Sequence, residues 1–213
     1  MSLIGWAARV SAFAAAALSI AILGYSGLAP RSAQGQAQEF TFALIGDVGY
    51  APREEPQVEN LLTDISRDSA LAFVAHDGDL SSPRFACTDE MLQRRLEQFN
   101  ALPHPVIFTP GDNDWTDCHD GQGVKGGNTL ERLARVREVF FQGEQSLGKR
   151  TMPLLRQSQS PEFSKYRENV RWDRGGVTFI TVHVPGSNNG LGRTSEDDAE
   201  YADRNKANMA WLR

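Results

Sequence analysis

The chain has 213 residues, of which 40% are hydrophobic and 23% are charged. This length and composition fit one globular domain with a sizeable core, because domains of roughly 100 to 200 residues are the usual case. The net charge of -5 and the scattered Lys and Arg residues argue against a nucleic-acid partner, since binding to a phosphate backbone normally needs a basic surface.

The N-terminal residues have the features of an export signal. Arg9 lies in a short n-region, residues 11–28 are rich in Ala, Leu and Ile, and Gly35-Gln36-Ala37 has the small residues of a cleavage site. We expect a signal peptide over 1–37 and a mature domain over 38–213, which would be periplasmic or secreted. The alternative is an uncleaved membrane anchor, because the apolar stretch approaches the ~17 residues that span a bilayer. Only this alternative gives the protein a membrane contact.

Short apolar runs alternate with helical spacings in the first half of the domain. The apolar runs predict strands at 40–45, 71–75 and 106–108. Helical spacing predicts a helix at 57–67, and a second helix begins after Thr88, a plausible N-cap. This β-α-β-α-β order favours an α/β fold with a parallel sheet, whose loops meet at the C-terminal ends of the strands.

A third helix is predicted further along the chain. Asn128, with Glu131 three residues later, resembles a capping box and predicts a helix that ends at Phe140. Residues 142–165 are polar and weakly patterned. We expect this segment to run over the surface.

An antiparallel hairpin and a final helix complete the expected elements. Strands at 170–173 and 177–184 are joined at Gly175-Gly176, a dipeptide suited to a tight turn. Residues 196–213 predict a helix with Trp211 near its end. No strand or cap follows this helix, so the domain is expected to be interrupted there.

Each of the first three predicted strands is followed by Gly and Asp. The motifs are Gly46-Asp47, Gly78-Asp79 and Gly111-Asp112. Ligands of open α/β folds usually bind at the edge where such strands end, so the three carboxylates are expected to converge on a divalent metal ion. The alternative is ordinary turn chemistry, since Asp and Gly are both frequent in turns. Three such motifs at successive strand ends favour the metal site.

The two cysteines, Cys87 and Cys118, each follow one of these motifs by a few residues. If the two strands are neighbours, a disulfide would join the loops that carry Asp79 and Asp112, and an oxidising compartment permits it. The alternative is a pair of buried free thiols, because the sequence does not establish that the Cα atoms lie within bridging distance.

With these motifs the chain resembles the calcineurin-like metallophosphoesterases, including the purple acid phosphatase group. Asp47-Val48-Gly49 is similar to the first motif of that family, Gly78-Asp79 to the second, and Gly111-Asp112-Asn113-Asp114 to the third. The resemblance implies a four-layer α/β/β/α sandwich with two metal ions (Mn, Fe, Zn or Mg) at its edge. Asp47, Asp79 and Asp112 would be the ligands, with Asp79 bridging the two ions.

The resemblance also implies catalytic positions at Asn113 and Asp114. Asn113 takes the place of a His that contacts the substrate phosphate, and it keeps a hydrogen-bond donor but loses proton donation near neutral pH. His119 is a candidate for the missing acid. Ser82 departs from the last position of the second motif, which puts that ligand or contact in doubt.

Other histidine ligands of the family are not found in this sequence. No Gly-His-x-His occurs, and His183 is expected to be a strand-end or loop residue rather than the single His ligand. In the order of the family's elements, a helix that ends in a Trp-Leu pair precedes the strand that carries that His. The chain is therefore expected to be the N-terminal portion of a longer domain.

These features favour an exported, metal-dependent phosphoester hydrolase. The enzyme would use a water activated by two metal ions to attack the phosphate of a small-molecule substrate. The alternative is an exported binding protein that keeps the fold without catalysis, and the departures at Ser82 and Asn113 support it. The sequence does not separate monoesters, diesters, nucleotides and lipid head groups as substrates.

Overall fold

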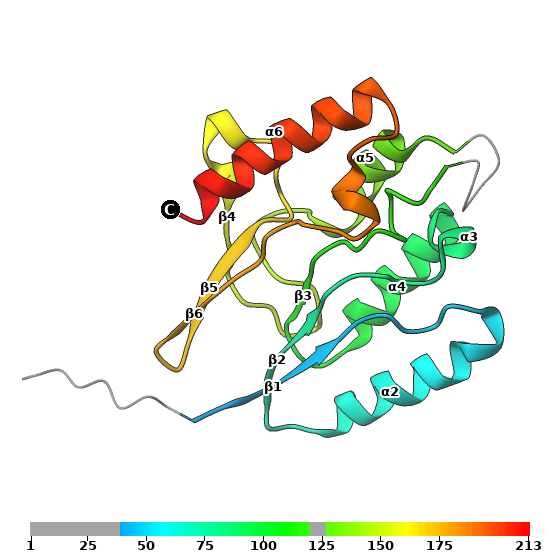
Figure 1. The fold of residues 1–213 in the computed structure, drawn as a ribbon. Coiled ribbons are helices and arrows are strands. Elements are labelled where there is room, and N and C mark those ends of the chain that lie inside the picture. The colour runs from blue at the N-terminus through cyan, green and yellow to red at the C-terminus, as the bar shows by residue number, and fades with distance from the viewer. Residues whose placement is uncertain (1–38, 120–126) are drawn as a thin grey trace, which may run out of the picture. The chain divides into compact units, whose positions relative to one another are not determined.

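A parallel three-stranded sheet organises the first half of the fold (Figure 1). The computed structural model describes residues 39–119 and 127–213, so the expected signal peptide at 1–37 lies outside the described residues. The strands, in spatial order, are β1 (Thr41–Ile45), β2 (Leu71–His76) and β3 (Val106–Phe108). Their last residues, Ile45, His76 and Phe108, lie in register. The loops that follow therefore leave the sheet at one edge, as predicted.

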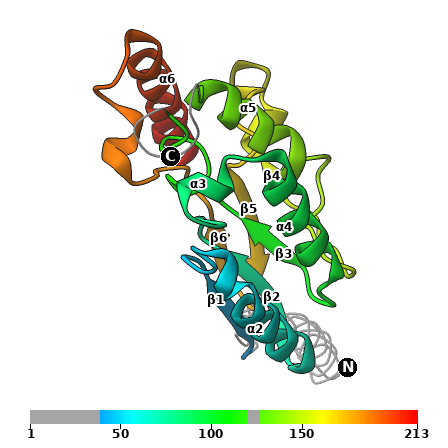
Figure 2. The ribbon, with the colours of Figure 1, turned by 90° about the vertical axis from the view of Figure 1, so that its right-hand side faces the viewer.

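Long helices follow each of these strands (Figure 2). They are α2 (Glu55–Arg67), α4 (Asp89–Ala101) and α5 (Thr129–Phe140). The Thr88 hydroxyl accepts the N–H of Met91 at 3.2 Å, and Asn128 Oδ1 accepts the N–H of Glu131 at 3.0 Å. Both predicted N-caps are therefore confirmed. Short helical turns, η1 (Pro52–Glu54) and α3 (Pro83–Ala86), lie in the loops after β1 and β2.

Apolar side chains from these helices and from the sheet form the larger core. Leu62 of α2, Phe99 of α4 and Val136 of α5 are buried together with Val74 and Phe108 of the sheet. Each helix contributes the apolar face that its sequence periodicity predicts. This core fixes the helices against the strands and so fixes where the strand ends lie.

A second sheet is antiparallel and comes from the later part of the chain. Its strands, in order, are β4 (Leu155–Arg156), β5 (Val170–Arg174) and β6 (Val177–Ile180). Gly175 and Gly176, at φ of 59° and 83°, turn the chain between β5 and β6. A two-residue turn with positive φ at both positions matches the twist of a hairpin and favours Gly. The predicted hairpin is confirmed, although β6 ends before the predicted Val184.

Residues 142–165 lie mostly on the surface, as expected, but parts of this segment are structured and buried. They contain β4 and two helical turns, η2 (Gln157–Gln159) and η3 (Pro161–Phe163), and they bury Leu154 and Arg156. The Arg156 guanidinium donates to the carbonyls of Gly143 at 2.6 Å and Arg167 at 2.7 Å. A buried charged side chain is tolerated when backbone acceptors satisfy it. Hydrophobic periodicity does not show such burial, so the sequence did not predict these buried positions.

The two sheets pack against each other through aromatic rings. The centroid of Phe73 in β2 lies 5.4 Å from that of Trp172 in β5 and 5.1 Å from that of Phe179 in β6. These rings belong to a second core that also contains Ile107 and Val170. The described residues thus form a mixed α/β fold with a parallel sheet and helices, as the sequence predicts. No described helix is long and apolar enough to cross a membrane.

The last helix, α6 (Ser195–Trp211), follows the short turn η4 (Ser187–Gly190). Its Asn208 side chain accepts a hydrogen bond from Asn169 at 2.8 Å, and its Ala207 carbonyl accepts one from Gln157 at 2.7 Å. The helix is thereby attached to the segments that flank β5 (Figure 1). It begins one residue before the predicted range.

Candidate functional site

The loops after β1, β2 and β3 bring Asp47, Asp79 and Asp112 to one edge of the parallel sheet. Asp47 and Asp79 adopt positive φ values of 54° and 56°, which are uncommon for residues with a side chain. A Cβ on Gly78 would lie 2.2 Å from the backbone nitrogen of Gly111. Glycine is therefore required where the second and third motif loops meet.

A tyrosine that the sequence analysis did not select joins the first two carboxylates. Tyr50 Oη lies 2.7 Å from Asp47 Oδ1 and 2.7 Å from Asp79 Oδ2. Burial and both carboxylates hold the pKa of Tyr50 well above its usual value, so the hydroxyl keeps its proton. One proton cannot be donated to two carboxylates at once.

Asp79 is partly buried and lies near two other acidic side chains, Asp112 and Asp114. Burial raises the pKa of Asp79 to about 7; the hydrogen bond from Tyr50 opposes this shift, and the charges of Asp114 and Asp112 add to it. Either a proton or a cation stabilises such a group, because like charges at short range disfavour ionisation. Perturbed carboxyl groups of this kind are concentrated at functional sites.

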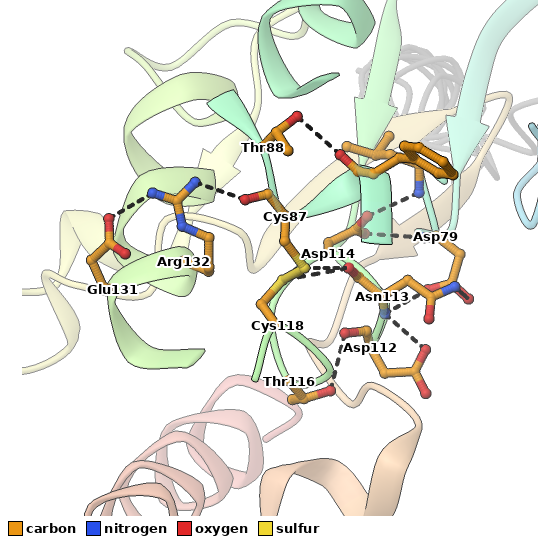
Figure 3. Close-up of a disulfide and its surroundings, with 12 residues drawn as sticks. Asp79, Cys87, Thr88, Asp112, Asn113, Asp114, Thr116, Cys118, Glu131 and Arg132 are labelled. Atoms are coloured by element: carbon orange, nitrogen blue, oxygen red, sulfur yellow. Dashed lines mark hydrogen bonds and ion pairs between the residues drawn. A yellow bond between two sulfur atoms is a disulfide. The ribbon is translucent and has the colours of Figure 1, made fainter. Parts of the chain in front are cut away.

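Asn113 joins Asp79 to Asp112 (Figure 3). Its backbone N–H lies 3.2 Å from Asp79 Oδ1 and 3.0 Å from Asp112 Oδ1, and its side-chain amide donates to Asp79 Oδ2 at 3.1 Å. Ser187 of η4 donates to Asp112 Oδ2 at 3.0 Å. The third carboxylate is thus held between its own loop and η4.

The structure gives Asp114 a different place from the expected catalytic one. Its side chain is fully buried, and its oxygens accept the backbone N–H groups of Asp79, Leu80 and Gly111 at 2.8 to 3.0 Å (Figure 3). Burial raises the pKa of Asp114 to about 6, although these N–H groups oppose the shift. A carboxylate enclosed in this way cannot touch a substrate. Asp114 instead positions the second motif loop against the third.

The disulfide between Cys87 and Cys118 is present, with the Cα atoms 5.5 Å apart. Figure 3 shows that it lies directly beside Asn113 and joins the segment before α4 to the segment after the third motif. The alternative of two free thiols is therefore excluded. The bridge restrains the two loops that carry Asp79 and Asp112.

His183 belongs to a buried network rather than to the group of carboxylates. Its Nε2 accepts the indole N–H of Trp115 at 3.0 Å, and its Nδ1 lies 3.0 Å from Glu168 Oε1. Indole N–H only donates, so Nδ1 carries the proton of a neutral ring. Both ring nitrogens are occupied by protein partners, which agrees with the expected loop residue and leaves no lone pair for a metal.

Two further sequence candidates, Ser82 and His119, follow the second and third motifs closely in the chain. Ser82 precedes α3 at its N-cap position, where its side chain makes no cap hydrogen bond. Its neighbour Ser81 is buried and donates to the carbonyl of Gly49 at 2.7 Å, so it links the second motif loop to the first. His119 lies beside Asn128 and Arg193 in a depression of about 270 Å³, and none of the three carboxylates is among its described lining residues.

The carboxylates of Asp47, Asp79 and Asp112 are suitable ligands for a cation, but their side chains are not spaced as a coordination shell in this structure. Within 39–119 and 127–213, no group of three or more His, Cys, Asp or Glu side chains is arranged to hold a metal ion. Tyr50 stands between Asp47 and Asp79, and Asn113 stands between Asp79 and Asp112. A bound ion would replace these hydrogen bonds, and it would neutralise the charge that one tyrosine proton leaves uncompensated.

Comparison with known proteins finds no relative whose function could be compared with this site. No protein-family model matches the chain, and no curated protein or solved structure matches it. The case for a function therefore rests on the geometry of this site.

A pH-dependent stability is expected from His76, which is buried at the end of β2 and accepts the N–H of Gly78 through Nδ1 at 3.2 Å. Burial, aided by the charge of Arg95, lowers the pKa of His76 to about 3. In the unfolded chain the pKa of His76 is about 6.5. Between about pH 6.5 and about pH 3, His76 is therefore mostly protonated in the unfolded state and neutral in the folded state, which favours unfolding. This residue should lower the free energy of unfolding by about 2 kcal/mol between pH 7 and pH 5.

The control is His76→Asn, whose side-chain oxygen can accept the same N–H. Asp79 and Asp114 have raised pKa values and titrate in the same window with the opposite sign. The informative quantity is therefore the difference between the two proteins in urea denaturation at pH 7 and pH 5. If the free energy of unfolding changed by the same amount between pH 7 and pH 5 in both proteins, His76 would not be held neutral in the folded state.

Proposed function

We propose that this chain is a metal-dependent phosphoester hydrolase of the calcineurin-like metallophosphoesterase type. The observation that carries the proposal is the chain of contacts from Asp47 through Tyr50 to Asp79, and from Asp79 through Asn113 to Asp112. Three carboxylates from three successive strand ends meet there, with Asp79 in the middle. A pair of metal ions with one bridging ligand would use these three carboxylates, once Tyr50 and Asn113 no longer stand between them.

In this proposal each residue has a distinct task. Asp47 and Asp112 would each hold one ion, and Asp79 would bridge them. The ions would polarise the phosphate and lower the pKa of a bound water. The Asn113 amide would release Asp79 and donate to a phosphate oxygen. Because the described ligands are all oxygen atoms, Mn²⁺ or Mg²⁺ fit this part of the site better than Zn²⁺.

Membership of this family would imply a four-layer α/β/β/α sandwich. The helices α2, α4 and α5, the two facing sheets and the helix α6 would correspond to the layers of an α/β/β/α sandwich. Export is part of the proposal, and the Cys87–Cys118 disulfide supports it because oxidising compartments permit such bridges. The substrate would be a small-molecule phosphoester.

The test is metal binding followed by hydrolysis, both on the full chain. After treatment with EDTA, calorimetric titration with Mn²⁺ should show up to two ions per chain, and p-nitrophenyl phosphate should be hydrolysed only when metal is restored. Asp64, an exposed residue of α2 paired with Arg67, offers a control. Asp64→Asn should bind metal and turn over substrate like the wild type. A chain that binds no divalent ion contradicts the proposal.

A second candidate function is a binding protein that keeps the fold without catalysis. The observation in its favour is that both His183 nitrogens are used by Trp115 and Glu168, so His183 does not supply an imidazole ligand to the carboxylates. A folded chain without bound metal and without hydrolysis would support this candidate. Metal binding at the three carboxylates would reject it.

A further inference from the structure

A cavity of about 610 Å³ lies at the opposite edge of the parallel sheet. Residues at the start of β2 and before β3 line it, together with parts of β4 and β5. Figure 1 shows where these strands lie in the fold. Its apolar lining includes Leu71, Phe73, Pro105, Met152, Leu155 and Trp172. Asp47, Asp79 and Asp112 are not among its described lining residues. Its volume lies within the range of small-molecule binding sites.

Three arginines, Arg150, Arg171 and Arg174, are among the residues that line this cavity. Arg150 donates to the carbonyl of Pro103 and to the ring of His104, both at 2.9 Å. Arg171 donates to the carbonyl of Trp211 at 3.0 Å, and its guanidinium carbon lies 4.8 Å from the centre of that indole ring. These neutral contacts orient two guanidinium groups without cancelling their charge.

The third arginine, Arg174, is exposed at the turn after β5. None of the ion pairs found among the described residues involves any of these three arginines. The one acid in the lining, Asp173, is exposed and accepts the hydroxyl of Thr178 at 2.5 Å. The cavity is therefore locally positive, in a chain whose net charge is -5.

An apolar wall accompanies this positive charge. Phe73 and Trp172 form its base, and Leu155 leaves 49% of its surface exposed. A guanidinium group matches the geometry of a carboxylate or phosphate, and it binds more strongly where its orientation is already set. Together these features select a ligand with an anionic end and an apolar body.

We propose that this cavity is a binding site for a small organic anion, in which a flat apolar body carries one carboxylate or phosphate group. The apolar body lies against Leu155 and Trp172. The anionic group binds Arg150 and Arg174, the two exposed arginines of the rim. The site is separate from the carboxylates of the proposed hydrolase and does not depend on them.

The experiment compares three probes that share a naphthalene ring: 2-naphthoate, 2-naphthyl phosphate and the neutral 2-naphthalenemethanol. Calorimetric titrations use the full chain in EDTA, which prevents hydrolysis and binding through metal. At least one anion should bind about 10-fold more tightly than the alcohol, and the tighter anion identifies the preferred group. Equal binding of all three probes, or no binding, overturns the proposal.

Variants locate the site. Arg174→Gln and Arg150→Gln should each weaken binding of the tighter anion about 5-fold, while circular dichroism shows an unchanged fold. Arg67→Gln removes an exposed arginine of α2 and should have no effect. Asp79→Asn should also bind the probe normally, which separates this result from the fate of the proposed hydrolase. Unchanged affinity in both Arg150→Gln and Arg174→Gln overturns the proposal.

Discussion

Replacing Asp79 with asparagine is expected to lower kcat/KM for p-nitrophenyl phosphate on the order of 1000-fold. Asp79 is the carboxylate that reaches both neighbours, through Tyr50 on one side and Asn113 on the other. Asparagine keeps the size of the side chain but loses the charge that a bridging ligand supplies. The measurement is steady-state hydrolysis with saturating Mn²⁺, alongside calorimetric titration of the metal.

The same substitution should leave the metal-free protein at least as stable as the wild type. The ionised Asp79 is disfavoured by burial and by the charges of Asp114 and Asp112, so removing its charge relieves that repulsion. Loss of activity without loss of stability is typical of a residue kept for function. Wild-type activity in Asp79→Asn, with Asp64→Asn as the matched control, would reject the di-metal mechanism.

Replacing Glu168 with glutamine is expected to lower the free energy of unfolding by about 4 kcal/mol. Glu168 is fully buried and accepts hydrogen bonds from Arg137 Nε at 3.0 Å and from His183 at 3.0 Å. Burial alone would raise the pKa of Glu168, but the charge of Arg137 and the bond from His183 hold it well below its usual value. Glutamine leaves Arg137 without a counter-charge and places an N–H₂ group against a donor.

Urea denaturation at pH 7 measures this loss, and pH gives a second readout. Because the folded pKa of Glu168 is lowered, its stabilisation is present above the unfolded value of about 4.3 and is lost as the pH falls. The gap between wild type and Glu168→Gln should therefore narrow below pH 4. The control is Glu138→Gln, since Glu138 is 65% exposed and pairs with Arg135. That change should cost less than about 0.5 kcal/mol.

If Glu168→Gln lowered the free energy of unfolding by no more than the control does, the buried pair would not stabilise the fold.

The network around Glu168 matters for the site because it continues through His183 to Trp115, which directly follows the third motif. Arg204 of α6 lies over the Trp115 ring at 5.2 Å and donates to the His183 carbonyl at 3.0 Å. Strands, helix α6 and the motif loop are thereby held together by side chains far apart in the sequence.

Local signals explain why much of the fold was predictable. The apolar runs that became β1, β2 and β3, the caps at Thr88 and Asn128, and the Gly175-Gly176 turn each depend on residues close in sequence. Such preferences act before any tertiary contact forms. The Gly-Asp motifs followed the same logic, because the end of a parallel strand determines the edge at which its loop emerges.

Long-range contacts decided what the sequence left open. The Tyr50 hydroxyl between Asp47 and Asp79, the burial of Asp114 and the place of His183 each depend on segments brought together by packing. The strand β4 forms by pairing with β5, and the buried Arg156 side chain donates to carbonyls outside that strand. By itself the sequence determined where the first three strands lie along the chain, the helix starts and the residue types of the candidate site. Only the tertiary structure decided which oxygens meet and which side chains are enclosed, because polar partners are chosen by distance in space and leave no periodic pattern in the chain.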